Sequence, residues 1–133
     1  MTDKEAVQVL AILKAAYPNS YKGMTKEEAK GTATVWAVQF ANIPVEVVLI
    51  AVNKLIATSP FPPAICDVKK KFGSIYYEAD EKIRLSDKLG GKDNKQIEFY
   101  KMVRNVTAPN RFHIEEPTIF EVIGGNDVLM IGE

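Results

Sequence analysis

The fold class is decided by residues 43–58, which read IPVEVVLIAVNKLIAT. Ile43-Pro44 interrupts the chain, because proline disfavours helical torsion angles in the residue before it. Beyond this break, bulky apolar residues recur at the spacing of one helical face: Val45, Val48, Leu49, Val52, Leu55 and Ile56. This broad stripe predicts a helix that ends near Thr58 and is the most buried helix of the fold.

Two helices are predicted before this stretch, each opened by a capping box. Thr2 with Glu5, and Thr25 with Glu28, place a hydroxyl and a carboxylate where they can bind the amides that a first helical turn leaves free. The first helix is expected to stop at Tyr17-Pro18. The apolar faces are Ala6, Val9, Leu10, Leu13 and Ala16 in the first helix and Ala29, Ala33, Trp36, Ala37 and Phe40 in the second. Trp36 therefore fits a core position better than an exposed recognition site.

Residues 59–63 read SPFPP and predict a rigid, extended connection. A proline-rich ligand for a partner domain is the alternative, but such ligands usually lie in exposed tails. A long helix should follow from Pro63 to about Leu89, with Cys66 packed as a small apolar residue near its start. Gly90-Gly91 should end this helix, and a last helix should cover about residues 94–105. Residues 1–107 are thus expected to form an all-α domain, a small bundle of four or five helices.

Composition limits the class of protein. The chain has 133 residues, of which 47% are hydrophobic and 26% charged, and this suits one compact domain. The single cysteine cannot form an internal disulfide, so a reducing compartment is expected. No segment reaches the ~18 consecutive apolar residues that predict a membrane span.

The C-terminal arm, residues 108–133, differs chemically from the rest of the chain. Residues 106–133 hold one base, Arg111, and five acids, whereas residues 1–105 hold 16 bases and 12 acids. The body is therefore basic and the arm acidic, although the whole chain is neutral. Acidic residues alternate with bulky apolar ones in the arm, which favours docking onto a partner over chemistry. Residues 118–123 and 128–131 are β-prone and flank a Gly-Gly-Asn-Asp turn, so the arm is expected to be disordered or to form a docked hairpin.

Three features of the segment from Val9 to Val68 stand out together: residues 9–18 (VLAILKAAYP), Trp36, and residues 59–68 (SPFPPAICDV). On these residues the segment resembles the phage replicative-helicase loader and inhibitor family. The resemblance implies a helical N-terminal domain followed by a C-terminal region that binds the ATP-bound hexameric replicative helicase. It further implies that the protein restrains the helicase's ATPase and unwinding and then delivers it to an origin-bound initiator. Such a protein would be encoded by a phage or prophage and act in the cytoplasm of the bacterial host.

The arm's composition agrees with this implied helicase contact. We predict that its apolar side chains anchor the helicase and that its carboxylates steer the encounter. The predicted helicase-binding residues are Phe112, Ile114, Glu115, Glu116, Ile119, Phe120, Val122, Leu129, Met130 and Ile131.

The alternative function is that of a nucleic-acid-binding accessory protein in a phage replication module. Lys69, Lys70 and Lys71 are the one basic cluster and could contact phosphates. Three adjacent lysines fan around a helix rather than forming a stripe that faces a groove, so direct DNA binding is expected to be weak or absent.

The sequence holds no catalytic pattern, cofactor motif or set of metal ligands. His113 is the only histidine and lies far along the chain from Cys66, so a nucleophile–base pair is not expected. Consecutive acids such as Glu27-Glu28 point about 100° apart on a helix and do not converge on one site. An adaptor without catalytic activity is therefore the prediction.

Overall fold

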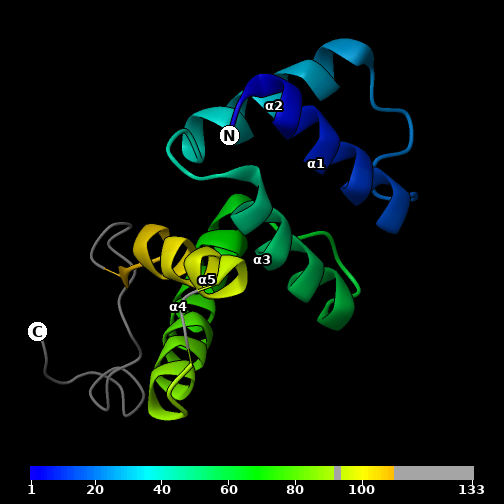
Figure 1. The fold of residues 1–133 in the computed structure, drawn as a ribbon. Coiled ribbons are helices and arrows are strands. Elements are labelled where there is room, and N and C mark those ends of the chain that lie inside the picture. The colour runs from blue at the N-terminus through cyan, green and yellow to red at the C-terminus, as the bar shows by residue number, and fades with distance from the viewer. Residues whose placement is uncertain (92–93, 110–133) are drawn as a thin grey trace, which may run out of the picture. The chain divides into compact units, whose positions relative to one another are not determined.

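The computed structural model describes residues 1–91 and 94–109, and the regular secondary structure in these ranges is helical (Figure 1). Its helices are α1 (Asp3–Ala16), α2 (Lys26–Gln39), α3 (Val45–Thr58), α4 (Ile65–Lys88) and α5 (Lys95–Val106). The predicted all-α class with four or five helices is thus confirmed for the described residues. The expected hairpin in the arm lies outside them.

The chain divides into two compact units. The N-terminal unit, Met1–Phe72, contains α1, α2, α3 and the first part of α4, and the C-terminal unit, Gly73–Glu133, contains the rest of α4 and α5. The division falls within α4. The predicted boundary between residues 107 and 108 stays a prediction, because nearly all of the arm lies outside the described residues.

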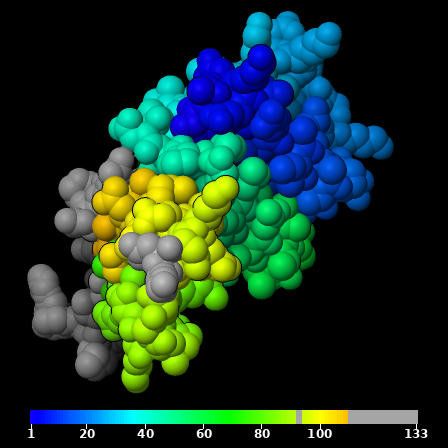
Figure 2. All heavy atoms as spheres, in the orientation of Figure 1, coloured from blue at the N-terminus to red at the C-terminus, as the bar shows by residue number. Residues whose placement is uncertain are grey.

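Both predicted capping boxes are present, and they set the starts of α1 and α2. Thr2 Oγ1 accepts a hydrogen bond from the Glu5 amide at 3.2 Å, and Glu5 Oε1 accepts one from the Thr2 amide at 2.9 Å. Thr25 and Glu28 repeat this exchange at 3.1 and 2.9 Å. The two helices pack against each other as a hairpin, and their side chains form one continuous surface in the space-filling view (Figure 2).

Aromatic side chains fill the core of the N-terminal unit. Phe40 and Phe72 are fully buried, and their ring centroids lie 5.9 Å apart in an edge-to-face arrangement. Trp36 is 8% exposed and lies 5.7 Å from Phe40, so its predicted core position is confirmed. Edge-to-face pairs of this kind stabilise a core beyond the area they bury.

The buried face of α3 is rotated from the predicted stripe. Val48 and Val52 are fully buried as expected, together with Val47 and Ala51. The other four residues of the predicted stripe, Val45, Leu49, Leu55 and Ile56, are half-buried. Apolar residues occur on every side of this helix, so their spacing alone does not identify its buried face.

The connector and the start of α4 agree with the sequence except at Cys66. Residues 59–64 lack helical structure and lead into α4, and the Tyr17 hydroxyl donates to the Ser59 carbonyl at 2.8 Å. The expectation that Cys66 packs in the core is wrong, because its side chain is exposed. Cys66 lies two residues, or about 200° around the helix, from Val68, which is fully buried.

In the C-terminal unit, α4 continues through Gly73 and ends where predicted. Gly90 has φ of 72°, a left-handed conformation that glycine adopts at low cost. The Gly91 amide donates to the Ser86 carbonyl at 2.7 Å and the Gly90 amide to the Asp87 carbonyl at 3.1 Å, which together form a Schellman motif. Asn94 then caps α5 by accepting from the Ile97 amide at 3.0 Å.

Candidate protein-docking surfaces

The ten predicted helicase-binding residues, from Phe112 to Ile131, lie outside the described residues. The structure instead describes the base from which the arm extends. That base is the end of α5, where Thr107 is fully buried and its hydroxyl donates to the Val103 carbonyl at 2.6 Å. The arm therefore begins at a well-packed helix end.

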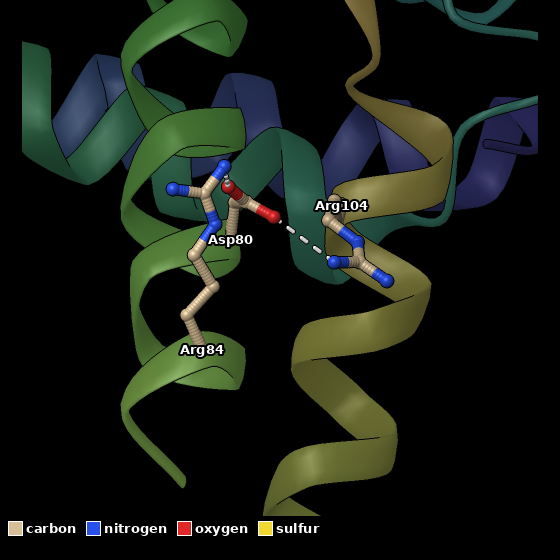
Figure 3. Close-up of polar contacts among 3 residues, drawn as sticks. All are labelled: Asp80, Arg84 and Arg104. Atoms are coloured by element: carbon tan, nitrogen blue, oxygen red, sulfur yellow. Dashed lines mark hydrogen bonds and ion pairs between the residues drawn. The ribbon is translucent and has the colours of Figure 1, made fainter. Parts of the chain in front are cut away.

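A charged cluster ties α5 to α4 (Figure 3). Asp80 on α4 accepts from Arg104 on α5, with 2.9 Å between Arg104 Nη1 and Asp80 Oδ1. Its other oxygen lies 2.8 Å from Arg84 Nη2, one turn along α4. The Asp80 side chain is only 14% exposed, whereas those of Arg104 and Arg84 are 38% and 79% exposed. The contact with Arg104 is therefore the better shielded of the two, and it fixes α5 against α4.

A second contact supports the same pair of helices. The Lys82 ammonium on α4 lies 5.5 Å from the centroid of the Tyr100 ring on α5, within the range of a cation–π interaction. Neither contact was predicted from the sequence, since the partners lie far apart along the chain. The one sign of these contacts in the sequence was that Arg104 is a basic residue in the last turn of a helix.

The three lysines of the predicted nucleic-acid contact differ in their surroundings. Lys69 Nζ donates to Gln39 Oε1 at 2.6 Å and lies 5.8 Å from the Phe40 ring centroid. Lys69 and Lys71 are half-buried, and Lys70 is exposed. Lys69 is thus held against the end of α2, whereas Lys70 is exposed. A nucleic-acid contact through them stays a prediction.

Two depressions flank α2 in the N-terminal unit. One, with a volume of about 730 Å³, lies between the α1–α2 loop and α2 and is lined by Tyr21, Met24, Gly31 and Val35 among others. The other, of about 470 Å³, is lined by Val7 and Leu10 of α1 and by Lys26, Glu27, Ala29 and Lys30 of α2. The second has mostly apolar walls and will be called the α1–α2 groove. Neither depression was predicted from the sequence, although Val7 and Val35 lie off the predicted core faces and are each 52% exposed.

Tyr21 occupies a partly buried position on the wall of the loop depression. Burial raises the pKa of the Tyr21 hydroxyl above its usual value, and the neighbouring Tyr17 raises it further. The hydroxyl is therefore neutral near pH 7 and does not suit a role as a base. Tyr21 serves as a wall of this depression.

In the part of the chain that the structure describes, no cluster of side chains could hold a metal ion. In the same ranges, no helix is long and apolar enough to cross a bilayer.

A comparison with protein-family models identifies the N-terminal unit. The model that matches residues 1–69 describes the N-terminal domain of a phage helicase inhibitor and loader protein. The chain belongs to this family. The resemblance drawn from Val9 to Val68 is therefore confirmed.

Membership in the phage helicase loader and inhibitor family associates the chain with phage DNA replication and a helicase partner. The match ends within the first turns of α4, so it covers the N-terminal unit and not α5 or the arm. Neither a search of curated proteins nor a search of solved structures found a match.

Proposed function

We propose that this protein is a non-catalytic adaptor that binds a hexameric replicative helicase, inhibits its ATPase and unwinding, and delivers it to an origin-bound initiator. The observation that carries the proposal is the family match over residues 1–69. The acidic, apolar composition of the arm supports it, because anchors flanked by carboxylates suit a basic, partly apolar partner surface.

The proposed mechanism assigns different tasks to the two ends of the chain. The arm contacts the helicase, with Phe120 and Leu129 as anchors and Glu115 and Glu116 steering the encounter. The helical body provides bulk or contacts the initiator. The clamp between Asp80 and Arg104 supports this division, because it gives the arm a firm base at the end of α5. Binding across helicase subunits would restrain the movements that ATP hydrolysis requires.

The direct test is to mix the purified full chain with the ATP-bound helicase in the absence of DNA. We expect the two proteins to co-elute in gel filtration and the helicase's ATPase rate to fall as the chain is added. A chain that neither co-elutes with the helicase nor alters its ATPase rate would contradict the proposal.

The arm should be separable from the body. Removing the residues after Asn110 should leave a cooperatively folding helical protein, because the buried side chains of α1 to α5 already form packed cores. Helicase binding should disappear. Circular dichroism and thermal melting measure the first outcome and co-elution the second. Loss of a cooperative melt would show that the arm belongs to the core.

The second candidate function is DNA binding through Lys69, Lys70 and Lys71. Exposed Lys70 is the observation that favours it. Binding of fluorescent DNA, measured at about 50 and about 200 mM salt, separates the two candidates, because contacts to phosphates weaken steeply with salt. We expect weak binding that vanishes at the higher salt concentration. Tight binding at the higher concentration, lost in Lys70→Glu, would favour the DNA-binding function.

A further inference from the structure

The connector between α3 and α4 carries an aromatic side chain that is exposed to solvent. Residues 59–63 join the end of α3 to the start of α4 (Figure 1), and Phe61 lies at their centre. Phe61 is 74% exposed and is the largest of the strongly exposed apolar side chains in the N-terminal unit. So exposed a ring contributes little to the fold, because apolar stabilisation scales with the area removed from water. Its area is instead available to a partner.

Hydrogen bonds and prolines hold the backbone around Phe61 in place. The Ser59 hydroxyl accepts from the Phe61 amide at 3.2 Å and donates to the Phe61 carbonyl at 2.9 Å. The Tyr17 hydroxyl in turn donates to the Ser59 carbonyl at 2.8 Å, which ties the connector to the end of α1. Prolines on both sides of Phe61 fix the backbone further. The side chain is therefore presented before a partner arrives, so binding costs little conformational entropy.

The burial of the prolines argues against the interpretation of residues 59–63 as a proline-rich ligand. Such a ligand binds by placing its prolines in an aromatic groove of the partner domain. Here Pro63 is buried and Pro62 is half-buried, so neither is free to enter such a groove. The side chain that the connector offers to a partner is Phe61.

The stretch around Phe61 carries no charged side chain. Residues 55–66 contain neither an acid nor a base, in a chain of which 26% of the residues are charged. The exposed residues of this stretch are Ala57, Thr58, Pro60, Phe61, Ala64 and Cys66. An uncharged surface with one aromatic anchor suits an apolar pocket. Its chemistry thus differs from that of the acidic arm.

Family membership gives this chain a helicase partner. The family match covers residues 1–69, so it includes Tyr17, Ser59 and Phe61 but none of the arm. The part of the chain that carries the family likeness therefore has an exposed anchor of its own. We infer that Phe61 inserts into an apolar pocket of the helicase, as a second point of attachment in addition to the arm. This inference rests on the proposed function, since it names a further contact with the same partner.

The experiment measures the affinity of the full chain for the ATP-bound helicase at about 50 and about 200 mM salt. Phe61→Ala removes the anchor, and Phe61→Leu keeps an apolar side chain. Val38→Ala is the matched control, because Val38 is 66% exposed in the same unit and lies on α2, away from the connector in the sequence. All substituted positions are exposed, so thermal melting should match that of the parent chain.

We expect Phe61→Ala to lose at least about tenfold in affinity for the helicase, and Phe61→Leu to lose less. The loss should occur even while the arm stays attached, because two contacts on one chain strengthen each other. It should be the same at both salt concentrations, since no charge is removed. Val38→Ala should bind as the parent does.

Four outcomes would overturn the inference. Parent affinity in Phe61→Ala would do so and leave the proposed function standing, provided that the parent chain binds the helicase. A lower melting temperature of Phe61→Ala would assign the ring to the fold. A loss of affinity in Val38→Ala as large as that in Phe61→Ala would show that the effect is not specific to the connector. A parent chain that does not bind the helicase would overturn the inference and the proposed function together.

Two other occupants of the connector surface are tested on the full chain alone. A second copy would make the parent chain elute as an oligomer that Phe61→Ala dissociates, whereas we expect the same elution volume for both. The chain's own arm would shift its NMR signals in Phe61→Ala, whereas we expect those of Phe120 and Leu129 to stay in place. Either contrary result would make the assignment of Phe61 to the helicase wrong.

Discussion

Asp80 contacts both Arg104 and Arg84, and measuring the energy of each contact separately tests how α5 is held against α4. The end of α5 is the base of the arm, so the same measurement tests how that base is fixed. Arg84 is 79% exposed and lies one turn from Asp80, so its pair should contribute only ~0.3–0.5 kcal/mol. The pair with Arg104 joins two helices, and a charge-assisted hydrogen bond contributes about 1.5–3 kcal/mol when shielded. Because Arg104 is 38% exposed, we reduce this to about 1–2 kcal/mol.

Double-mutant cycles isolate each coupling energy. Asp80→Ala is combined with Arg104→Ala in one cycle and with Arg84→Ala in the other. Because the single tryptophan, Trp36, lies in the N-terminal unit, the readout should be hydrogen exchange of amides within α5, such as that of Val103. A coupling of Asp80 to Arg104 no larger than its coupling to Arg84 would refute the assignment of this pair as the clamp.

Three further predictions concern the N-terminal unit. Thr25→Ala should destabilise it by about 1 kcal/mol in urea unfolding followed by Trp36 fluorescence, because the capping box is lost. Gly31→Ala should instead stabilise it by about 0.5–1 kcal/mol by the same measurement, since nothing lies within 4 Å of an added Cβ at this position in α2. The raised pKa of Tyr21 means that the folded state holds the hydroxyl proton more tightly than the unfolded state does. The protonated hydroxyl therefore contributes fully to the stability of the fold below the unfolded pKa of about 10, and this contribution is lost as pH rises through the folded-state pKa. Alkaline unfolding of Tyr21→Phe should therefore show a shallower fall in stability than that of the parent protein.

Local signals in the sequence predicted the helices well. The capping boxes, the stop at Tyr17-Pro18 and the Gly90-Gly91 end of α4 depend on interactions over a few residues, which the sequence displays directly. The core position of Trp36 followed from the apolar neighbours on its own helix face. The structure thus agrees with the predictions that rested on residues close together in the sequence.

Features that depend on packing between helices were missed. The buried face of α3 could not be predicted because its sides are almost equally apolar. Cys66 is exposed because α4 is oriented with Val68 in the core, which places Cys66 on the other side of the helix. The clamp between Asp80 and Arg104 joins residues of different helices. The α1–α2 groove arises only when the two helices are placed side by side. The distances between these residues depend on how the helices pack, so they cannot be read from a single sequence.

The central claim is that the arm binds the helicase through apolar anchors, and its most direct measurement is the dissociation rate from immobilised, ATP-bound helicase. The test variant is Phe120→Ala with Leu129→Ala, and the matched control is Leu85→Ala with Leu89→Ala, two exposed leucines of the body. Each anchor truncation costs ~2 kcal/mol or more, which is a factor of about 30. Dissociation of the double variant should therefore be faster by a factor of about 30 to 1000, depending on how far the two losses add. The control should dissociate at the parent rate. An unchanged dissociation rate for the Phe120/Leu129 variant would contradict the claim that the arm is the helicase-binding element.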